Sequence, residues 1–223
     1  MGLIQGRAAD GEAGAWVIVL VKDLDHAKQR LGAVLDPKAR RALALRNAVR
    51  AIRAAAAGDH PLVIGGSPEV KEIAKRLGVD AVIERRQQGQ NVAAKLGISH
   101  ALKGKARAVL ILSSDLPLVT PKSVKEMLDV AGRVVPPAVV AAPALGRGGT
   151  NALYMSPPDA ISLHFGADSL SAFRQDAETK GVNFTVHKSD ALALDLDEPD
   201  DLEQARKKVS TRRLRPSGRR RID

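Results

Sequence analysis

The sequence predicts an α/β protein with a doubly wound, mostly parallel sheet. A continuous apolar run at residues 108–112, bounded by polar residues, is typical of a strand buried on both faces of a parallel sheet. Similar short runs alternate with stretches whose apolar residues recur at helical spacing, which favours this fold class. With 223 residues, 44% of them hydrophobic, the chain can bury one substantial core, so we expect a single domain at residues 15–209.

The first part of the chain alternates strands with helices. We expect strands at residues 15–21, 62–64, 79–84 and 108–112, each a short apolar run. Helices are predicted at residues 38–57, 68–77, 91–102 and 121–131, from apolar residues at helical spacing. Pro37 stands at the start of the first helix, where the missing proline N–H costs no hydrogen bond. A charged loop fills residues 22–36.

The pattern changes after Pro143. Residues 138–142 are predicted to be extended, and Gly146 to Thr150 form a loop too rich in glycine for a helix or strand. A strand at 151–155, a helix at 168–180 and a strand at 183–187 follow. The run at residues 191–197 alternates apolar residues with Asp195 and Asp197 and is predicted to be a strand. The last helix is expected at residues 198–209, with Pro199 in its first turn.

The positive charge is concentrated at the end of the chain. The net charge is +10, and the residues from Arg206 onward contain nine Lys or Arg and one Asp, which together contribute +8. We expect residues 210–223 to be a disordered basic tail and residues 1–14 to be a flexible N-terminus. Because aromatic residues make up only 2% of the chain, the body has little surface for base stacking, and nucleic-acid binding is expected only weakly, through the tail.

Other aspects of the composition favour a soluble cytoplasmic protein. The chain has no cysteine, which excludes disulfides and thiolate metal sites. It has no apolar stretch long enough to span a bilayer, and residues 1–14 lack the apolar core of a signal peptide. The five histidines are scattered without ligand spacing.

Three aspartates are predicted to meet at one edge of the sheet. Asp115 follows the strand at 108–112, and Asp195 and Asp197 come from the second apolar run. Ligands of such sheets lie beyond the carboxyl ends of the strands, and three carboxylates there indicate a divalent metal such as Mg²⁺. The alternative is that these aspartates cap helices or turns; Asp197 in particular could cap the last helix.

Basic residues follow the first strand. The chain contains neither G-x-G-x-x-G nor G-x-x-x-x-G-K-[ST], the glycine-rich motifs that bind phosphates in many nucleotide-binding proteins. Lys22, Lys28 and Arg30 occupy that place instead and would neutralise a polyphosphate. The alternative is an ordinary solvated loop.

Six short motifs, in order along the chain, carry a resemblance to a known family. They are V-K-x-L-x-x-A-K-x-R-L at 21–31, G-x-N at 89–91, S-D-L-P at 114–117, G-T-N-A-L at 149–153, F-G-A-D-S at 165–169 and L-D-L-D-E-P-D-D-L at 194–202. The chain resembles the 2-phospho-L-lactate guanylyltransferase family. The resemblance implies a nucleotidyltransferase fold like that of the nucleotide-diphospho-sugar transferases. It also implies an enzyme of coenzyme F420 biosynthesis that joins GMP from GTP to a small phosphorylated carboxylic acid and releases pyrophosphate.

The resemblance also implies roles for individual residues. Metal binding falls on Asp115, Asp195 and Asp197, nucleotide binding on Lys22, Lys28, Arg30 and Asn91, and binding of the acid on Thr150, Gly166 and Ser169. The chain departs from many relatives at Gln29 and Ser114, which leaves the charges intact. The implied partners are GTP, a phosphorylated three-carbon acid and the next enzyme of the F420 pathway.

Several alternatives stay open at this point. The acceptor can be 2-phospho-L-lactate, phosphoenolpyruvate or 3-phosphoglycerate, because these acids share a phosphate and a carboxylate. Another nucleotidyltransferase of the same fold, such as one that acts on molybdopterin, is the nearest alternative enzyme. A non-catalytic protein that binds nucleic acid, or a scaffold, is the alternative of another class.

Overall fold

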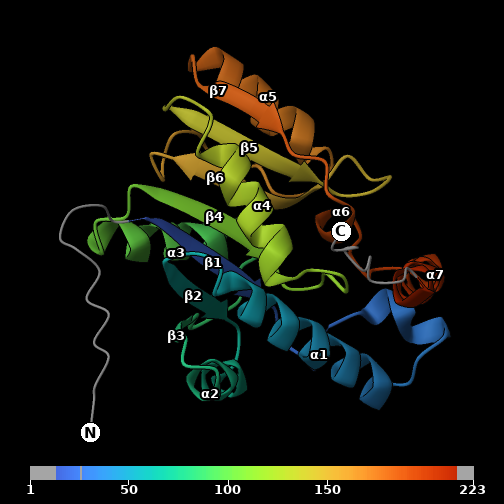
Figure 1. Ribbon diagram of the computed structural model, residues 1–223. Helices are drawn as coiled ribbons and strands as arrows, with labels where there is room; N and C mark the ends of the chain where they lie inside the picture. The colour runs from blue at the N-terminus through green and yellow to red at the C-terminus, as the bar shows by residue number, and fades with distance from the viewer. Residues whose placement is uncertain (1–13, 26, 215–223) are drawn as a thin grey trace, which may run out of the picture.

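A computed structural model describes residues 14–25 and 27–214, with side chains described as far as Lys208 (Figure 1). Seven strands form one sheet in the order β3-β2-β1-β4-β6-β5-β7. Strand β6 runs antiparallel to its neighbours β4 and β5, and the other pairings are parallel. The predicted fold class, a mostly parallel α/β sheet, is therefore confirmed.

The elements alternate as the sequence predicts in the first part of the chain. The strands are β1 (Ala15–Val21), β2 (His60–Gly65), β3 (Asp80–Ile83), β4 (Ala108–Ser113), β5 (Ala138–Pro143), β6 (Thr150–Ser156) and β7 (Asn183–Val186). The helices are α1 (Pro37–Ala55), α2 (Pro68–Arg76), α3 (Gln90–Lys103), α4 (Pro121–Ala131), α5 (Ser169–Thr179), α6 (Asp190–Ala193) and α7 (Pro199–Leu214), with a 3-10 helix η1 at Gln29–Ala33.

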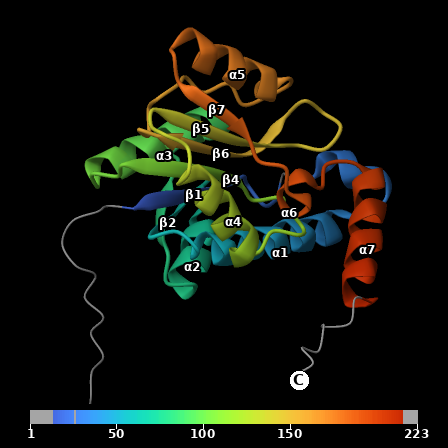
Figure 2. The same cartoon turned by 45° about the horizontal axis from the view of Figure 1, so that its top comes forward.

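The sheet is covered on both faces, which explains its continuous apolar strands. One buried cluster joins alternate residues of β1, such as Val17 and Val19, to helices α1, α2 and α4. A second cluster joins the intervening residue Ile18 to α3 and α5. Figures 1 and 2 show these helices on opposite sides of the sheet. The side chains of residues 17–21 and 109–112 are therefore buried whichever way they point.

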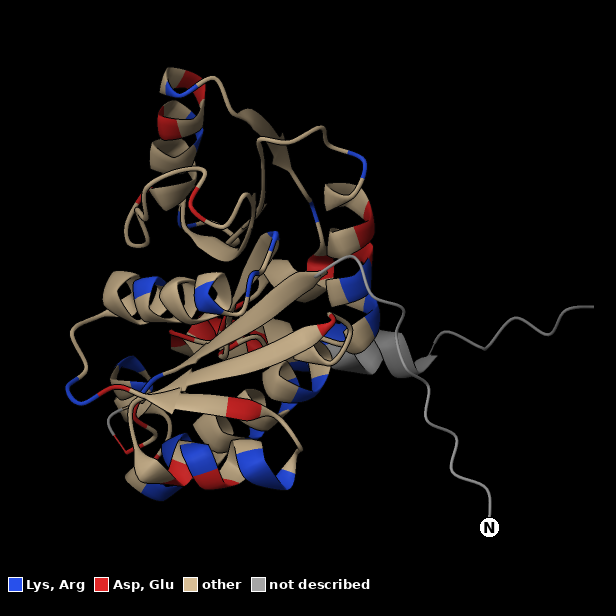
Figure 3. Ribbon diagram, turned by 90° about the vertical axis from the view of Figure 1, so that its left-hand side faces the viewer, with Lys and Arg blue, Asp and Glu red and all other residues tan. Residues whose placement is uncertain are grey.

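Helix starts follow ordinary capping rules. The Asp36 side chain accepts a hydrogen bond of 2.7 Å from the backbone N–H of Ala39 and caps α1. Thr120 and Ser123 form a capping box at the start of α4. Figure 3 shows residues of both charges on several outer helices, as expected for a body whose charges nearly balance.

The structure corrects the strand that was predicted at residues 191–197. Asp190–Ala193 form the short helix α6, and the residues from Leu194 to Glu198 have no regular structure. Leu192, Leu194 and Leu196 are buried, as the alternation predicts, but they lie beyond the ends of the strands and pair with none of the strands in the described residues. The alternation of apolar and polar residues correctly indicates which side chains are buried. It does not show that the segment pairs with a neighbouring strand.

A second correction concerns the last helix, which continues to Leu214 instead of ending at Val209. Residues 210–214, which were predicted to belong to the disordered tail, are helical because Arg212, Arg213 and Leu214 favour helix and no helix breaker precedes Pro216. The predictions for residues 1–13 and 215–223 lie outside the described residues. Within the described part of the chain, no helix is both long and apolar enough to cross a membrane.

Candidate functional site

The structure brings Asp115, Asp195 and Asp197 together at the carboxyl end of β4. Each offers a carboxylate oxygen, and these oxygens lie within 4.8 Å of one another. Asp115 lies two residues after the end of β4, whereas the other two lie on the irregular segment between α6 and α7. That segment is held in place because the backbone N–H of Leu196 donates to the carbonyl of Asp115 at 3.2 Å. The carboxylates therefore meet as predicted, although the strand that was expected to carry two of them is absent.

Lys28 lies between two of these carboxylates. Its Nζ is 2.9 Å from Asp115 Oδ2 and 3.2 Å from Asp197 Oδ1, and its side chain is only 6% exposed. Lys28 precedes η1 with a left-handed backbone, at φ 60°. Such a conformation is costly for a residue with a side chain and often marks a functional position. Buried Leu31 anchors η1 in a small apolar cluster with Leu43 and Leu196, which fixes the loop that carries Lys28.

These contacts shift the pKa values of the charged groups in the site. Burial alone would raise the pKa of Asp115, but Lys28 and the hydroxyl of Ser113 hold that pKa below its usual value. Burial would likewise lower the pKa of Lys28, but Asp115 and Asp197 hold it above its usual value. Burial and the neighbouring carboxylate of Asp115 raise the pKa of Asp195, despite the nearby Arg147. Asp115 is therefore a carboxylate, and Lys28 a cation, at neutral pH.

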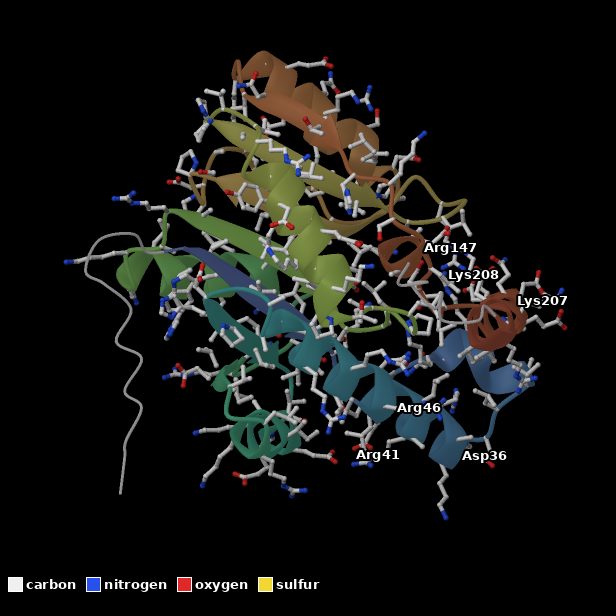
Figure 4. All side chains as sticks on the ribbon, in the orientation of Figure 1. Asp36, Arg41, Arg46, Arg147, Lys207 and Lys208 are labelled. Carbon is white, nitrogen blue, oxygen red and sulfur yellow. The ribbon has the colours of Figure 1, made fainter. Side chains whose placement is uncertain are left out.

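Arg147 is a component of the site that the sequence reasoning missed. It extends from the glycine-rich loop between β5 and β6 toward the start of α7 (Figure 4). One of its nitrogens is 3.2 Å from Asp195 Oδ2, and another donates to the carboxylate of Asp201. The carboxylate of Asp201 accepts hydrogen bonds from two backbone N–H groups just before α7, those of Asp197 at 2.9 Å and Glu198 at 2.7 Å. The acceptor at this helix start is therefore Asp201 and not Asp197. The signal in the sequence that could have indicated this role is a single arginine within the glycine-rich loop at residues 146–149.

A cavity of about 450 Å³ opens on one side of the aspartates. Lys22, Lys28 and Arg30 all line it, together with Asp115 and Asp197. Arg30 is largely exposed, at 71%, and lies 3.7 Å from Glu198, whereas Lys28 is buried. The volume is in the range of nucleotide-sized sites, and its positive rim matches a polyphosphate. At its far end the cavity is lined by Glu84 and Gln87, which follow β3.

A pair of buried hydroxyl groups lies on the other side of Asp115, where β6 begins. The hydroxyl of Ser169 donates to that of Thr150 at 3.1 Å, and the two residues are 1% and 6% exposed. Asp168 has a left-handed backbone at φ 51°, and Gly166 has φ 145°. The loop is fixed by a 3.0 Å hydrogen bond from the N–H of Leu170 to the carbonyl of Gly148. Thr150, Gly166 and Ser169 thus lie on one turn-rich wall.

Asn91 lies beside this wall. Its Oδ1 accepts from the backbone N–H of Phe165 at 2.8 Å, and its Nδ2 donates to the carbonyl of the same residue at 3.0 Å. Among the described residues that line the cavity, Asn91 does not appear. The nucleotide contact that was predicted for Asn91 stays a prediction, and the geometry gives the residue a second role in holding Phe165 and Gly166 in place.

Comparison with known proteins identifies the family. Residues 15–206 match the family described as guanylyl transferase CofC like. The chain belongs to this family. It is 41% identical over 190 residues to the phosphoenolpyruvate guanylyltransferase of Rubrobacter xylanophilus, covering 84% of this chain and 91% of the relative. It is 35% identical to the 2-phospho-L-lactate guanylyltransferase of Methanothermobacter thermautotrophicus, covering 83% and 81%.

Other relatives extend this comparison. The chain is 31% identical to the 3-phospho-D-glycerate guanylyltransferase of Colwellia psychrerythraea, covering 84% of this chain and 89% of that one. A solved nucleotidyl transferase from Methanothermobacter superposes with a TM-score of 0.64 at 15% identity, covering 89% and 99%. A Desulfovibrio desulfuricans protein assigned as a nucleotide-diphospho-sugar transferase gives 0.65 at 16%, covering 94% and 91%. These structures confirm the predicted nucleotidyltransferase fold of the CofC-like chain.

Family membership decides between the alternatives left open by the sequence. It favours a guanylyltransferase over an enzyme that acts on molybdopterin, and a catalyst over a nucleic-acid-binding scaffold. The relatives' names differ in the acid, so membership leaves the acceptor open among three acids.

Proposed function

We propose that this CofC-like protein transfers GMP from GTP to a small phosphorylated carboxylic acid and releases pyrophosphate. The observation that carries the proposal is the position of Asp115 just beyond the carboxyl end of the central strand β4. The cationic cavity lies toward β1, β2 and β3, and the hydroxyl pair lies toward β6. Two substrates bound in these places would meet at the aspartates.

The reaction needs positioning and charge neutralisation more than acid–base chemistry. A phosphate oxygen of the acid attacks the α-phosphorus of GTP, the bond from that phosphorus to the bridging oxygen breaks, and pyrophosphate leaves with its electron pair. The attacking phosphate is already an anion, so the chain need not remove a proton. Lys28, Lys22 and Arg30 hold the polyphosphate and offset the charge that collects on the leaving group.

The aspartates fit a hard divalent cation. All three offer carboxylate oxygens, which are the ligands that Mg²⁺ prefers over nitrogen or sulfur. When bound, Mg²⁺ would neutralise phosphate charge and polarise the α-phosphoryl group. Asp115, Asp195 and Asp197 would hold it, and Lys28 and Arg147, which contact the same carboxylates, would offset part of their negative charge.

The acid would bind at the wall formed by Thr150, Gly166 and Ser169. The hydroxyl of Thr150, which accepts from Ser169, keeps its own proton to donate to a carboxylate or phosphate oxygen, and the missing side chain of Gly166 allows its N–H to approach an anion. Phosphoenolpyruvate is the first acceptor to test, because it is the acid named for the relative at 41% identity. The product is a phosphoanhydride, which the next enzyme of coenzyme F420 biosynthesis would consume.

The proposal is tested by pyrophosphate release. The protein is incubated with Mg²⁺, one of the four common nucleoside triphosphates and one of the three acids, with each substrate also omitted in turn. We expect release that requires GTP and an acid together. Release from GTP alone at the same rate, or no release from any pair, would contradict guanylyl transfer.

Asn91→Ala should weaken binding of the acid. Loss of both hydrogen bonds to Phe165 frees the loop before Gly166, so we expect the KM for the acid to rise roughly tenfold, as loss of about 1.4 kcal/mol would give. The KM for GTP should stay unchanged. Gln88→Ala, an exposed change near the same helix, is the control. A raised KM for GTP with an unchanged KM for the acid would instead support the direct nucleotide contact.

Gly166→Ala should also act on the acid, through two effects that a matched variant separates. At φ 145° any side chain strains the backbone, and a Cβ there meets no protein atom within 4 Å, so it projects into open space at the proposed acid site. Gly181→Ala is the control because that glycine also has positive φ, at 66°, and equally open surroundings, but lies after α5. We expect both variants to lose stability and only Gly166→Ala to raise the KM for the acid, by roughly tenfold or more. Equal KM values in the two variants would remove Gly166 from the acid site.

A further inference from the structure

Glu84 lines the nucleotide cavity but takes no part in the transfer described above. It directly follows β3, and its backbone N–H donates to the carbonyl of Gly65, at the end of β2, at 2.9 Å. Its Oε1 is buried and has no hydrogen-bond partner among the described residues. Burial raises the pKa of Glu84. A desolvated carboxylate oxygen without a donor is unfavourable, and a ligand that brings donors into the cavity would relieve it.

The position of Glu84 matches the base of the nucleotide. Strands β4, β1, β2 and β3 are neighbours in that order, and neighbouring strands are about 4.8 Å apart. Glu84 at the end of β3 therefore lies roughly three strand spacings, about 14 Å, from Asp115 at the end of β4. When the polyphosphate lies beside Asp115 and Lys28, the nucleoside extends along the strand ends toward Glu84. Leu20 and Ala93 line the cavity between them and offer apolar surface for a flat base.

The chemistry at this end of the cavity distinguishes guanine from the other bases. Guanine presents two adjacent donors, N1–H and the 2-amino group, which one carboxylate can accept together. Adenine presents an unprotonated N1 at the same place, and two acceptors would then repel each other. Gln87 lines the same end, and because its Oε1 accepts from the N–H of Asp23 at 3.2 Å, its amide NH₂ is a donor suited to guanine O6.

We propose that Glu84 is the residue that selects GTP, by accepting hydrogen bonds from N1–H and the 2-amino group of guanine. The inference rests on the proposed function. It assigns the selection of the base to the end of β3, a different place from the three aspartates and from the wall formed by Thr150, Gly166 and Ser169.

The test changes both partners in this contact, the side chain at position 84 and the base of the nucleotide. Glu84→Gln keeps the shape of the side chain and replaces one acceptor oxygen by a donor NH₂ group. Xanthosine triphosphate carries a carbonyl where GTP carries the 2-amino group, so it should pair with the new donor. We expect kcat/KM for GTP to fall by about tenfold to a hundredfold, and kcat/KM for xanthosine triphosphate to rise until it equals or exceeds that for GTP. Glu72→Gln, the same change on the exposed surface of α2, should alter neither value.

A second variant tests the same role without relying on xanthosine triphosphate. Wild-type protein should prefer GTP over inosine triphosphate, which lacks the 2-amino group, by about tenfold, and Glu84→Ala should abolish that preference. Thermal unfolding of each variant establishes that it is folded. An unchanged ratio of GTP to inosine triphosphate in Glu84→Ala, or no gain for xanthosine triphosphate in Glu84→Gln, would overturn the role of Glu84 while wild-type guanylyl transfer stands. Failure of wild-type protein to use GTP would overturn both proposals.

Discussion

Asp115→Asn should abolish turnover and leave the fold intact. The amide keeps the shape of the carboxylate but loses its charge, so Lys28 loses its principal partner and the site loses the ligand closest to the end of β4. A cation that neutralises phosphate charge contributes several kcal/mol to such a transfer, which corresponds to a fall in kcat/KM of about 10³-fold. Pyrophosphate release with GTP and phosphoenolpyruvate measures the effect.

The control for this variant is Asp80→Asn. It makes the same chemical change at an exposed position at the amino end of β3, on the opposite edge of the sheet from Asp115. The control should keep wild-type turnover, and circular dichroism should show folded protein for both. Turnover near the wild-type value in Asp115→Asn would remove this aspartate from the reaction.

The sequence alone predicts the part of the molecule that depends on local patterns. Short apolar runs predict all seven strands within a few residues, because strands covered on both faces must be apolar throughout. The meeting of Asp115 with Asp195 and Asp197 was also predictable, since polar residues that follow buried segments gather at one edge of the sheet. Lys28 was predicted from its place after the first strand.

What the sequence does not predict depends on contacts between distant segments. The alternation of Leu192, Leu194 and Leu196 arises from burial beyond the strand ends, and no local pattern distinguishes this from a strand. The contact of Arg147 with Asp195 joins residues 48 positions apart, and that of Asn91 with Phe165 joins residues 74 apart. Glu84 ends a predicted strand like many surface residues. Its place in the cavity and its buried oxygen, which has no hydrogen-bond partner in the described part of the chain, distinguish it.

The contacts of Lys28 lead to a prediction with two opposite effects. Its ammonium group lies between Asp115 and Asp197, beside carboxylates that a divalent cation would also use. Removing the cation from a buried ion pair leaves an uncompensated charge, which typically costs about 3–5 kcal/mol of folding free energy. Lys28→Met keeps the length of the side chain and removes its charge, so it should lower the Tm in the presence of a chelator.

Mg²⁺ should then partly restore that Tm. The three carboxylates of Lys28→Met repel one another without the ammonium group, so they should bind Mg²⁺ more tightly than the wild-type site does. At a given Mg²⁺ concentration, tighter binding to the folded state raises the Tm further. Turnover should nonetheless fall by about 10²- to 10³-fold, as it does when a preorganised donor to a developing charge is lost.

The measurement is Tm over a series of Mg²⁺ concentrations, with pyrophosphate release on the same samples. Lys105→Met is the matched control, because Lys105 also has φ 60° but is exposed at the end of α3. If Mg²⁺ raises the Tm of Lys28→Met no more than that of wild type, the aspartates do not form a cation site that Lys28 shares.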